Sequence, residues 1–207
     1  MKKLILRMSV SLDGFMAGPS NNLEWLFPSM SDEGKQWISE HLSRAGAHLM
    51  GSHTYADMAC YWPKSNDLLA PCMNDIPKVV FSQRSVSSIL ERTTQALTDA
   101  SAATPIDPSI AKSWAAPRIV SGNLADEIAR LKAEPGKDLV AHGGVAFARS
   151  LVASSLVDEY WLIVAPVALG RGQGLFSELP QPQHFERVSS TSFASGASAQ
   201  ILRPKRA

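Results

Sequence analysis

The sequence is poor in cysteine and carries no excess charge of either sign. Cys60 and Cys72 are the two cysteines among 207 residues. They have no closely spaced Cys or His partners, so the sequence indicates neither a disulfide scaffold nor a zinc site, and we predict no bound metal. The 20 Lys and Arg residues balance 19 Asp and Glu residues, which leaves a formal net charge of +1. That balance argues against nucleic acid, a membrane surface or an acidic protein as the partner.

Targeting signals and long apolar runs are also missing from the sequence. Lys2 and Lys3 precede a short apolar run, but Arg7 and Asp13 interrupt it and no small-residue cleavage site follows. No apolar run is long enough to span a bilayer. Because 207 residues with 45% apolar side chains can bury a sizeable core, we predict a single cytoplasmic domain over residues 1–207.

The most informative stretch begins at residue 139. Leu139–Ala141 is a short apolar run typical of a buried parallel strand, and it is followed by the turn His142-Gly143-Gly144. Apolar residues then recur at helical spacing from about Val145, and a second strand is predicted at residues 160–167. The two glycines allow a ligand to approach the backbone, and a helix that starts there directs its free N–H groups toward an anion such as phosphate. A tight turn between strand and helix with nothing bound would have the same pattern.

The rest of the chain alternates between strands and helices. Ser31 and Asn123 are good N-caps for two helices, and residues 51–55 lead into another. Residues 85–116 are rich in Ser, Thr, Ala and Pro, and we predict an insertion there, with a short helix at 87–97, a loop at 100–108 and Trp114 as an anchor. The further strands are predicted at residues 4–10, 47–50, 77–81, 118–120, 185–193 and 197–203.

Five short motifs, in this order, resemble the dihydrofolate reductase-like superfamily. They are MSVSLDGFMAG at 8–18, LMGSHTY at 49–55, KVVFSQR at 78–84, LVDEYWL at 156–162, and PVALGRGQGLF at 166–176. With the His-Gly-Gly turn, they resemble in particular the reductase domain of the bifunctional riboflavin-biosynthesis deaminase/reductase. The resemblance implies a three-layer α/β fold with a mainly parallel central sheet and an antiparallel C-terminal hairpin. It also implies a homodimer that pairs through the sheet and the C-terminal region.

The resemblance further implies NADPH as the cofactor and gives positions for its binding residues. Ser9, through its backbone, and Met16 would lie near the nicotinamide, and Ser82-Gln83-Arg84 would suit the ribose 2′-phosphate. Gly51 to Thr54 would hold the pyrophosphate, with Ser52 standing where the family usually has an arginine. The complete set implied in this way is Ser9, Met16, Gly51, Ser52, His53, Thr54, Ser82, Gln83, Arg84, His142, Gly143, Gly144, Val145 and Ala146.

The implied reaction is hydride transfer from NADPH to an electron-poor C=N or C=O carbon of a small pterin- or pyrimidine-like molecule. Asp13, Asp32 or water would supply the proton. True dihydrofolate reductases hold the pterin with a carboxylate, and its position falls here on Met30 or Lys35, depending on which motif is used for counting. Neither residue is acidic, which argues against folate.

A second possibility is a nucleotide-binding protein of the same fold without significant turnover. The Ser at position 52 and the missing pterin carboxylate both favour it. The H-x-E and P-C-x-x-C motifs of a zinc deaminase are also missing from the sequence, which weakens the expectation of a riboflavin-pathway substrate.

Overall fold

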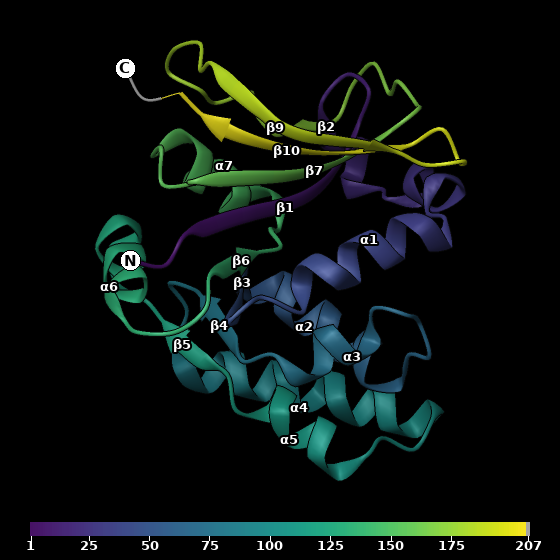
Figure 1. Cartoon of the computed structure of the whole chain (residues 1–207). Helices are drawn as coiled ribbons and strands as arrows, with labels where there is room; N and C mark the ends of the chain where they lie inside the picture. Colours follow the sequence, from purple (N-terminus) through teal and green to yellow (C-terminus); the bar gives the residue numbers. More distant parts are fainter. Residues whose placement is uncertain (206–207) are drawn as a thin grey trace.

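A computed structural model describes residues 1–205, with only the backbone described at residue 103. Its core is an eight-stranded sheet in the order β5-β4-β3-β6-β1-β7-β10-β9 (Figure 1). The first six strands in that order are parallel, whereas β10 is antiparallel to both β7 and β9. The strands are β1 (Leu4–Ser11), β3 (Ala47–Gly51), β4 (Lys78–Phe81), β5 (Arg118–Val120), β6 (Leu139–Ala141), β7 (Glu159–Ala165), β9 (Phe185–Ser192) and β10 (Ser198–Pro204). β2 (Phe15–Ala17) and β8 (Gln173–Gly174) form a separate small sheet.

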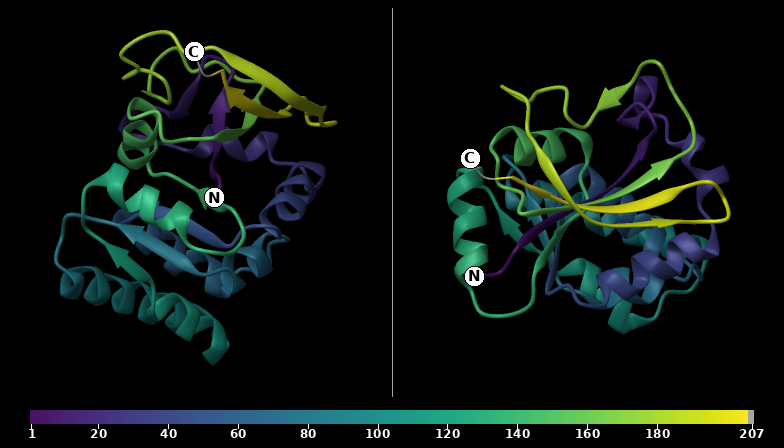
Figure 2. Two further views of the ribbon diagram at one scale, coloured as in Figure 1. Left: turned by 60° about the vertical axis from the view of Figure 1, so that its left-hand side comes forward. Right: turned by 45° about the horizontal axis from the view of Figure 1, so that its top comes forward.

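Helices cover both faces of the large sheet. The core on one face includes side chains from α6 (Leu124–Ala133) and α7 (Val145–Ala153). The other face packs against α1 (Asp32–Leu42), α2 (Ser52–Tyr61) and α3 (Ala70–Asp75), with α4 (Val86–Ala103) and α5 (Pro108–Ala115) outside α2. Figure 2 shows the β9–β10 hairpin at one edge of the sheet and the α4–α5 pair at the opposite end of the molecule. Short 3-10 helices occur at Pro19–Asn21, Glu24–Ser29 and Trp62–Lys64.

The alternation of side chains along β1 explains this layering. Leu4 and Leu6 point into the core beneath α6 and α7, whereas Ile5 packs on the side of α1. Arg7, in the middle of this strand, belongs to neither apolar cluster.

The predicted parallel sheet and antiparallel hairpin are confirmed, and each predicted strand agrees with the structure to within about two residues. The N-caps are also confirmed: Ser31 accepts a hydrogen bond from Gly34 N, and Asn123 accepts from the amides of Ala125 and Asp126. Among the described residues, no helix is long and apolar enough to cross a membrane.

The prediction for residues 85–116 needs correction, because no loop spans residues 100–108. α4 extends through eighteen residues, with Ile89, Leu97 and Ala100 buried at helical spacing, and α5 follows after a short connection. The hydroxyl-rich composition is compatible with a helix here because many hydroxyls donate to the carbonyl four residues earlier. These donors are Thr93, Thr94, Thr98 and Ser101.

The predicted anchor, Trp114, is confirmed. It is fully buried, its indole N–H donates to Asn74 Oδ1 at 2.8 Å, and its carbonyl accepts a hydrogen bond from the Tyr55 hydroxyl. The Lys78 ammonium lies 4.5 Å from the indole ring centroid. Residues 86–115 therefore pack firmly on the outer side of α2.

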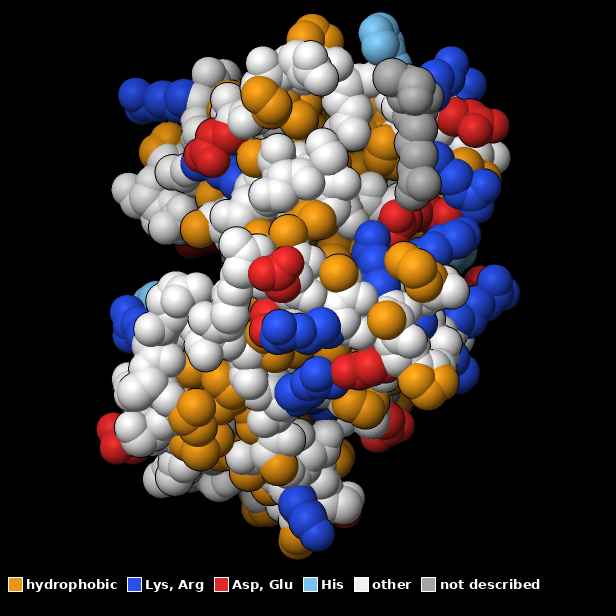
Figure 3. All heavy atoms as spheres, turned by 90° about the vertical axis from the view of Figure 1, so that its left-hand side faces the viewer, with side chains coloured by type: hydrophobic (Ala, Val, Ile, Leu, Met, Phe, Trp, Pro, Cys, Tyr) orange, Lys and Arg blue, Asp and Glu red, His pale blue; other side chains and the backbone are white. Residues whose placement is uncertain are grey.

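The surface at the amino ends of the parallel strands mixes both signs of charge. Figure 3 shows Lys and Arg side chains interspersed there with Asp and Glu. Several form ion pairs, including Arg118 with Glu134 at 2.6 Å and Lys132 with Asp158 at 2.5 Å. This face therefore does not present the continuous basic surface that would bind nucleic acid.

Candidate functional site

Two helices begin side by side at the carboxyl edge of the sheet. α2 follows β3 and α7 follows β6, and these two strands are hydrogen-bonded neighbours. The pairing continues into the turns, because Gly51 N donates to Gly143 O at 3.1 Å. A Cβ atom added to Gly144 would lie 2.7 Å from Thr54 Oγ1. Glycine at position 144 therefore lets the first turn of α7 approach the first turn of α2 closely.

The first amides of both helices are available to a ligand. The N-cap residues are Gly51 and Gly144, and neither has a side chain that caps the helix. The first N–H groups of a helix have no partner within it, and the helix dipole adds positive potential at the same end. Two such ends side by side suit a diphosphate. The predicted residues in these turns are Ser52, His53, Thr54, Val145 and Ala146.

The residues after β4 extend this region. Arg84 Nη2 lies 3.3 Å from His53 Nε2, so the structure brings together two predicted residues from different motifs. Arg84 N donates to Ser82 Oγ at 3.1 Å. Gln83 and Arg84 are exposed. An exposed guanidinium beside the start of α2 can reach a second phosphate on the same ligand.

Asp13 joins two loops. Its carboxylate accepts hydrogen bonds from Ser11 Oγ at 2.6 Å, Gly170 N at 2.7 Å and Leu169 N at 3.1 Å. The Ser11 hydrogen bond, followed by that of the Gly170 amide, lowers the pKa of Asp13 to about 2. The group is therefore ionised at neutral pH, and these contacts favour a role in holding the loops over donation of a proton.

The other residues predicted near the reaction, Ser9, Met16 and Asp32, lie on three different elements. Ser9 lies on β1 and lines a small pocket between the sheet and α1. Met16 is buried in the core on the side of α6 and α7. Asp32 is exposed at the first residue of α1.

Two cationic side chains, Arg7 and Lys35, line the small pocket that contains Ser9, and we call them its floor. The pocket has a volume of about 10 Å³ and includes Met30 and Lys35, the two alternative positions of the pterin carboxylate. Lys35 pairs with Asp67 at 2.6 Å. Arg7 Nε is buried without a hydrogen-bond partner among the described residues. Burial lowers the pKa of Arg7 to about 10, so it remains charged at neutral pH. The lining residues are Arg7, Ser9, Ser29, Met30, Gly34, Lys35, Ile38, Ile163 and Phe193, and no carboxylate is among them.

A pair of buried histidines lies next to this floor. His142 Nε2 is 2.7 Å from His48 Nδ1, and His48 Nε2 is 3.1 Å from the Cys72 carbonyl oxygen. Burial lowers the pKa of His48 to about 4. The sequence prediction included His142 but not Arg7 or His48. The available signal was a lone basic residue in each of two strands that contain no other charged residue.

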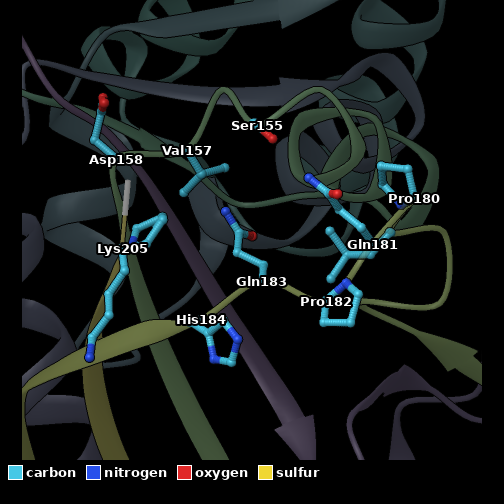
Figure 4. A pocket seen from close by; sticks show the side chains of 11 residues that line it. Ser155, Val157, Asp158, Pro180, Gln181, Pro182, Gln183, His184 and Lys205 are labelled. Carbon is cyan, nitrogen blue, oxygen red and sulfur yellow. The ribbon is translucent and has the colours of Figure 1, made fainter. Parts of the chain in front are cut away.

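A more spacious cavity lies elsewhere. It has a volume of about 590 Å³ and lies between the α7–β7 turn and the loop before β9. Figure 4 shows Ser155 and Val157 on one side of it and Gln183 and His184 on the other. No predicted cofactor residue lines this cavity. Its size alone does not identify it as the functional site, because the uncapped N-termini of α2 and α7 lie at the carboxyl edge of the sheet.

Comparison with known proteins identifies the family and the fold. A family model described as the RibD C-terminal domain matches residues 2–198. The uncharacterized protein YyaP of Bacillus subtilis (strain 168) is 25% identical over 197 residues, which cover 94% of this chain and 91% of YyaP. A proposed riboflavin biosynthesis protein from Shewanella sp. PV-4 superposes over the full length of both chains with a TM-score of 0.71 and 22% identity. Dihydrofolate reductase from Enterococcus faecalis, complexed with NADP(H), superposes over 99% of this chain and 97% of its own with a TM-score of 0.59 and 11% identity. The fold is therefore dihydrofolate reductase-like.

Proposed function

The chain belongs to the RibD C-terminal domain family, and on that premise we propose that it is an NADPH-dependent reductase of a small electron-poor heterocycle, carbonyl or imine. The observation that carries the proposal is the contact between the first turns of α2 and α7, whose N-caps leave their amides free. Those amides would hold the cofactor diphosphate. Arg84, beside His53, would hold the 2′-phosphate that distinguishes NADPH from NADH.

The chain's own residues would bind and orient the reactants. NADPH, when bound, supplies a hydride from its nicotinamide C4. Ser9 on β1 lines the small pocket beside which the acceptor carbon would lie. The proton has a separate source. Of the three sources considered, Asp13 is ionised and engaged by three donors, and Asp32 is exposed at the start of α1. Solvent water is the remaining candidate.

The floor of the pocket supports a substrate rich in hydrogen-bond acceptors. Arg7 and Lys35 carry only donors, and Met30 offers no strong acceptor. A pterin presents amino groups and a protonated ring nitrogen at the corresponding edge, and these would find no carboxylate here. The pocket, of about 10 Å³, has room for a single small group only, and a carbonyl oxygen of an oxo-substituted heterocycle such as a pyrimidinone is a group that would meet these donors.

Binding and turnover are tested in two steps. Fluorescence titration with NADPH and NADH measures the cofactor preference, and we expect NADPH to bind more tightly. NADPH oxidation is then followed with panels of oxo-pyrimidines, pterins and simple imines. Equal affinity for the two cofactors would contradict the assignment of Arg84.

A nucleotide-binding protein without turnover is the alternative, and the serine at position 52 favours it, since a phosphate-binding arginine is usual there in the family. Tight NADPH binding, with no oxidation above the rate without protein on any panel, would support this alternative. Restoring the charge with Ser52→Arg tightens NADPH binding if the serine weakens the site.

We also propose a cytoplasmic homodimer. β9 is the edge strand of the large sheet and most of its residues are exposed, so its outer backbone groups can pair with a second copy. Cys60 and Cys72 are both free thiols, which suits a reducing compartment. Light scattering at micromolar concentration should give twice the chain mass of 22.4 kDa; a monomer mass would refute the dimer.

A further inference from the structure

Two cavities adjoin at the amino edge of the sheet, opposite the edge at which α2 and α7 begin. The larger one is the cavity of about 590 Å³ described above, and the smaller one has a volume of about 440 Å³. Asp158, just before β7, and Pro204, at the end of β10, line both cavities. Because β10 runs antiparallel to β7, both residues lie at the edge where the parallel strands begin. A single ligand can therefore reach from one cavity into the other.

Basic side chains dominate the smaller cavity. Lys2, Lys3, Lys132 and Arg203 line it, and Asp158 is the one carboxylate among its described lining residues. Lys132 Nζ already neutralises this carboxylate at 2.5 Å. The Arg203 guanidinium uses Nε in a hydrogen bond, and no described residue accepts from its Nη groups. The cavity thus offers more donors than acceptors, which suits an anion.

The ion pairs around this cavity leave an excess of positive charge. Five basic side chains share three carboxylates as ion-pair partners. The pairs are Lys2 and Arg118 with Glu134, Lys3 and Arg203 with Glu159, and Lys132 with Asp158. A fourth carboxylate, Asp138, accepts from the Lys3 amide, and Lys205 in the larger cavity offsets its charge. Two positive charges therefore remain in excess, which matches a phosphomonoester dianion.

Lys2 has the donors that are most clearly unused. Its side chain is only 10% exposed, and the Glu134 carboxylate oxygen lies 3.7 Å from its ammonium nitrogen, outside hydrogen-bonding distance. Its backbone amide donates to Lys132 O at 2.9 Å, which fixes it beside the end of α6. No described residue accepts a hydrogen bond from the Lys2 ammonium. An anion in the cavity would supply the acceptors that this largely buried cation lacks.

The larger cavity offers uncharged groups beside this cationic one. Three prolines and Val157 supply apolar walls, and Ser155, Gln181 and Gln183 supply polar groups. Figure 4 shows the side-chain amides of Gln181 and Gln183 turned from the loop before β9 toward Ser155 and Val157. Gln183 Oε1 is buried without a hydrogen-bond partner among the described residues. A volume of about 590 Å³ is ample for a small organic molecule.

We propose that the two cavities together form a second binding site, for a phosphomonoester of a small ring compound. The phosphate lies in the smaller cavity, where Lys2, Lys132 and Arg203 donate to its oxygens. The ring lies in the larger cavity, between the prolines and the glutamine amides. This site is separate from the proposed cofactor edge and binds its ligand whether or not NADPH is bound. No covalent step is involved.

Binding is measured by calorimetry at pH 8 with phenyl phosphate, inorganic phosphate and phenyl sulfate. Phenyl phosphate is a dianion at this pH, because the second pKa of a phosphate ester is about 6, whereas phenyl sulfate carries a single charge. We expect phenyl phosphate to bind about tenfold or more tightly than either of the other two. Equal affinity for phenyl phosphate and inorganic phosphate, or for phenyl phosphate and phenyl sulfate, would overturn the proposal, as would no binding of phenyl phosphate.

A matched pair of variants separates the cavity from the general charge of this edge. Lys2→Met keeps the apolar stem and removes an ammonium that makes no hydrogen bond, so the variant should melt close to the wild type. It should bind phenyl phosphate about tenfold more weakly. Lys137→Met removes one charge from the same edge, but Lys137 is exposed and lines neither cavity, so its affinity should stay within about twofold of the wild type. Equal losses in the two variants would overturn the proposal.

The location is checked by ¹H–¹⁵N correlation spectra and by competition. We expect phenyl phosphate to shift the backbone amides of Lys2 and Val157 and the side-chain amide of Gln183. Its affinity should be unchanged when one equivalent of NADPH is present. Shifts confined to the starts of α2 and α7, or displacement of phenyl phosphate by NADPH, would place the probe in the cofactor site and overturn the proposal. Failure of NADPH to bind at all would instead contradict the proposed function and leave the phenyl phosphate measurements decisive for this site.

Discussion

The proposed cofactor edge and the floor of the small pocket between the sheet and α1, which we propose faces the substrate, present different kinds of chemical group. At the cofactor edge the groups that would contact the ligand are mostly backbone amides, at the starts of α2 and α7. At the floor they are side chains, namely Arg7 and Lys35. A backbone site requires only that glycine and small residues keep the turn open. A side-chain site changes its chemistry with each substitution.

The largest expected effect tests whether the floor has lost pterin recognition. Two pterin donors left without a carboxylate should cost about 1–3 kcal/mol each. We therefore expect turnover with dihydrofolate at least about thirtyfold below a typical enzyme value on the order of 10 per second. Steady-state NADPH oxidation with dihydrofolate measures it.

Asp32→Asn is the control for this experiment. The exposed carboxylate at the start of α1 should contribute nothing, so the variant should match the wild type. Typical turnover in the wild type that disappears in Asp32→Asn would show that Asp32 is the acid that holds the pterin.

The second effect tests whether the stability of the folded protein depends on His48 being neutral. Burial, together with the charge of Lys78, lowers the pKa of His48 from 6.5 to about 4, although the bond to Cys72 opposes the shift. Between these pH values the unfolded chain binds more protons than the folded protein, so the free energy of unfolding should fall as pH falls. The loss should reach roughly 3 kcal/mol over that window and be absent above about pH 6.5.

Urea unfolding at pH 7 and pH 4.5 measures this loss. His48→Asn removes the titrating ring, although His142, Arg7 and Lys78 remain around it. The variant should therefore lose less stability than the wild type over the same interval. An identical pH dependence in both proteins would mean that His48 does not carry the effect.

The third effect concerns Arg84, a long charged side chain at the proposed cofactor edge. Arg84→Ala should weaken NADPH binding by about 1.5–3 kcal/mol, because a charge-assisted bond to the 2′-phosphate is lost. NADH binding should be unchanged, which separates this loss from damage to the neighbouring His53. Arg187→Ala, an exposed arginine on β9, serves as the matched control in the same fluorescence titrations. An equal loss for both cofactors would assign Arg84 a structural role.

The smallest expected effect tests whether the cofactor binds against the backbone at Gly144. Gly144→Ala alone would meet Thr54 Oγ1 at 2.7 Å, so the substitution is made in a Thr54→Ala background that removes this contact. The double variant should melt like Thr54→Ala but bind NADPH about tenfold more weakly, a change of about 1.4 kcal/mol. If calorimetry shows equal affinity in the two, the glycine serves the packing of the helices and not the cofactor.

Much of the fold and of the cofactor edge could be predicted because its signals are local. The strand, the His142-Gly143-Gly144 turn and the first turn of α7 are consecutive in the chain. The same holds for Gly51 and α2, and for β4 and Ser82 to Arg84. Helix α4 was underestimated for a local reason as well. Its Ser and Thr residues resemble those of a loop in composition, yet their hydroxyls bond back to the preceding turn.

By itself the sequence determined the order of the elements, the two glycine turns and the balance of charge, since these depend on neighbouring residues. Only the tertiary structure decided that His48 and His142, 94 residues apart, share a hydrogen bond beside Arg7. That contact requires β6 to lie between β1 and β3 with one particular register. Strand pairing over such distances follows from the packing of the whole core, and a shift of one residue would turn each of these side chains to the opposite face.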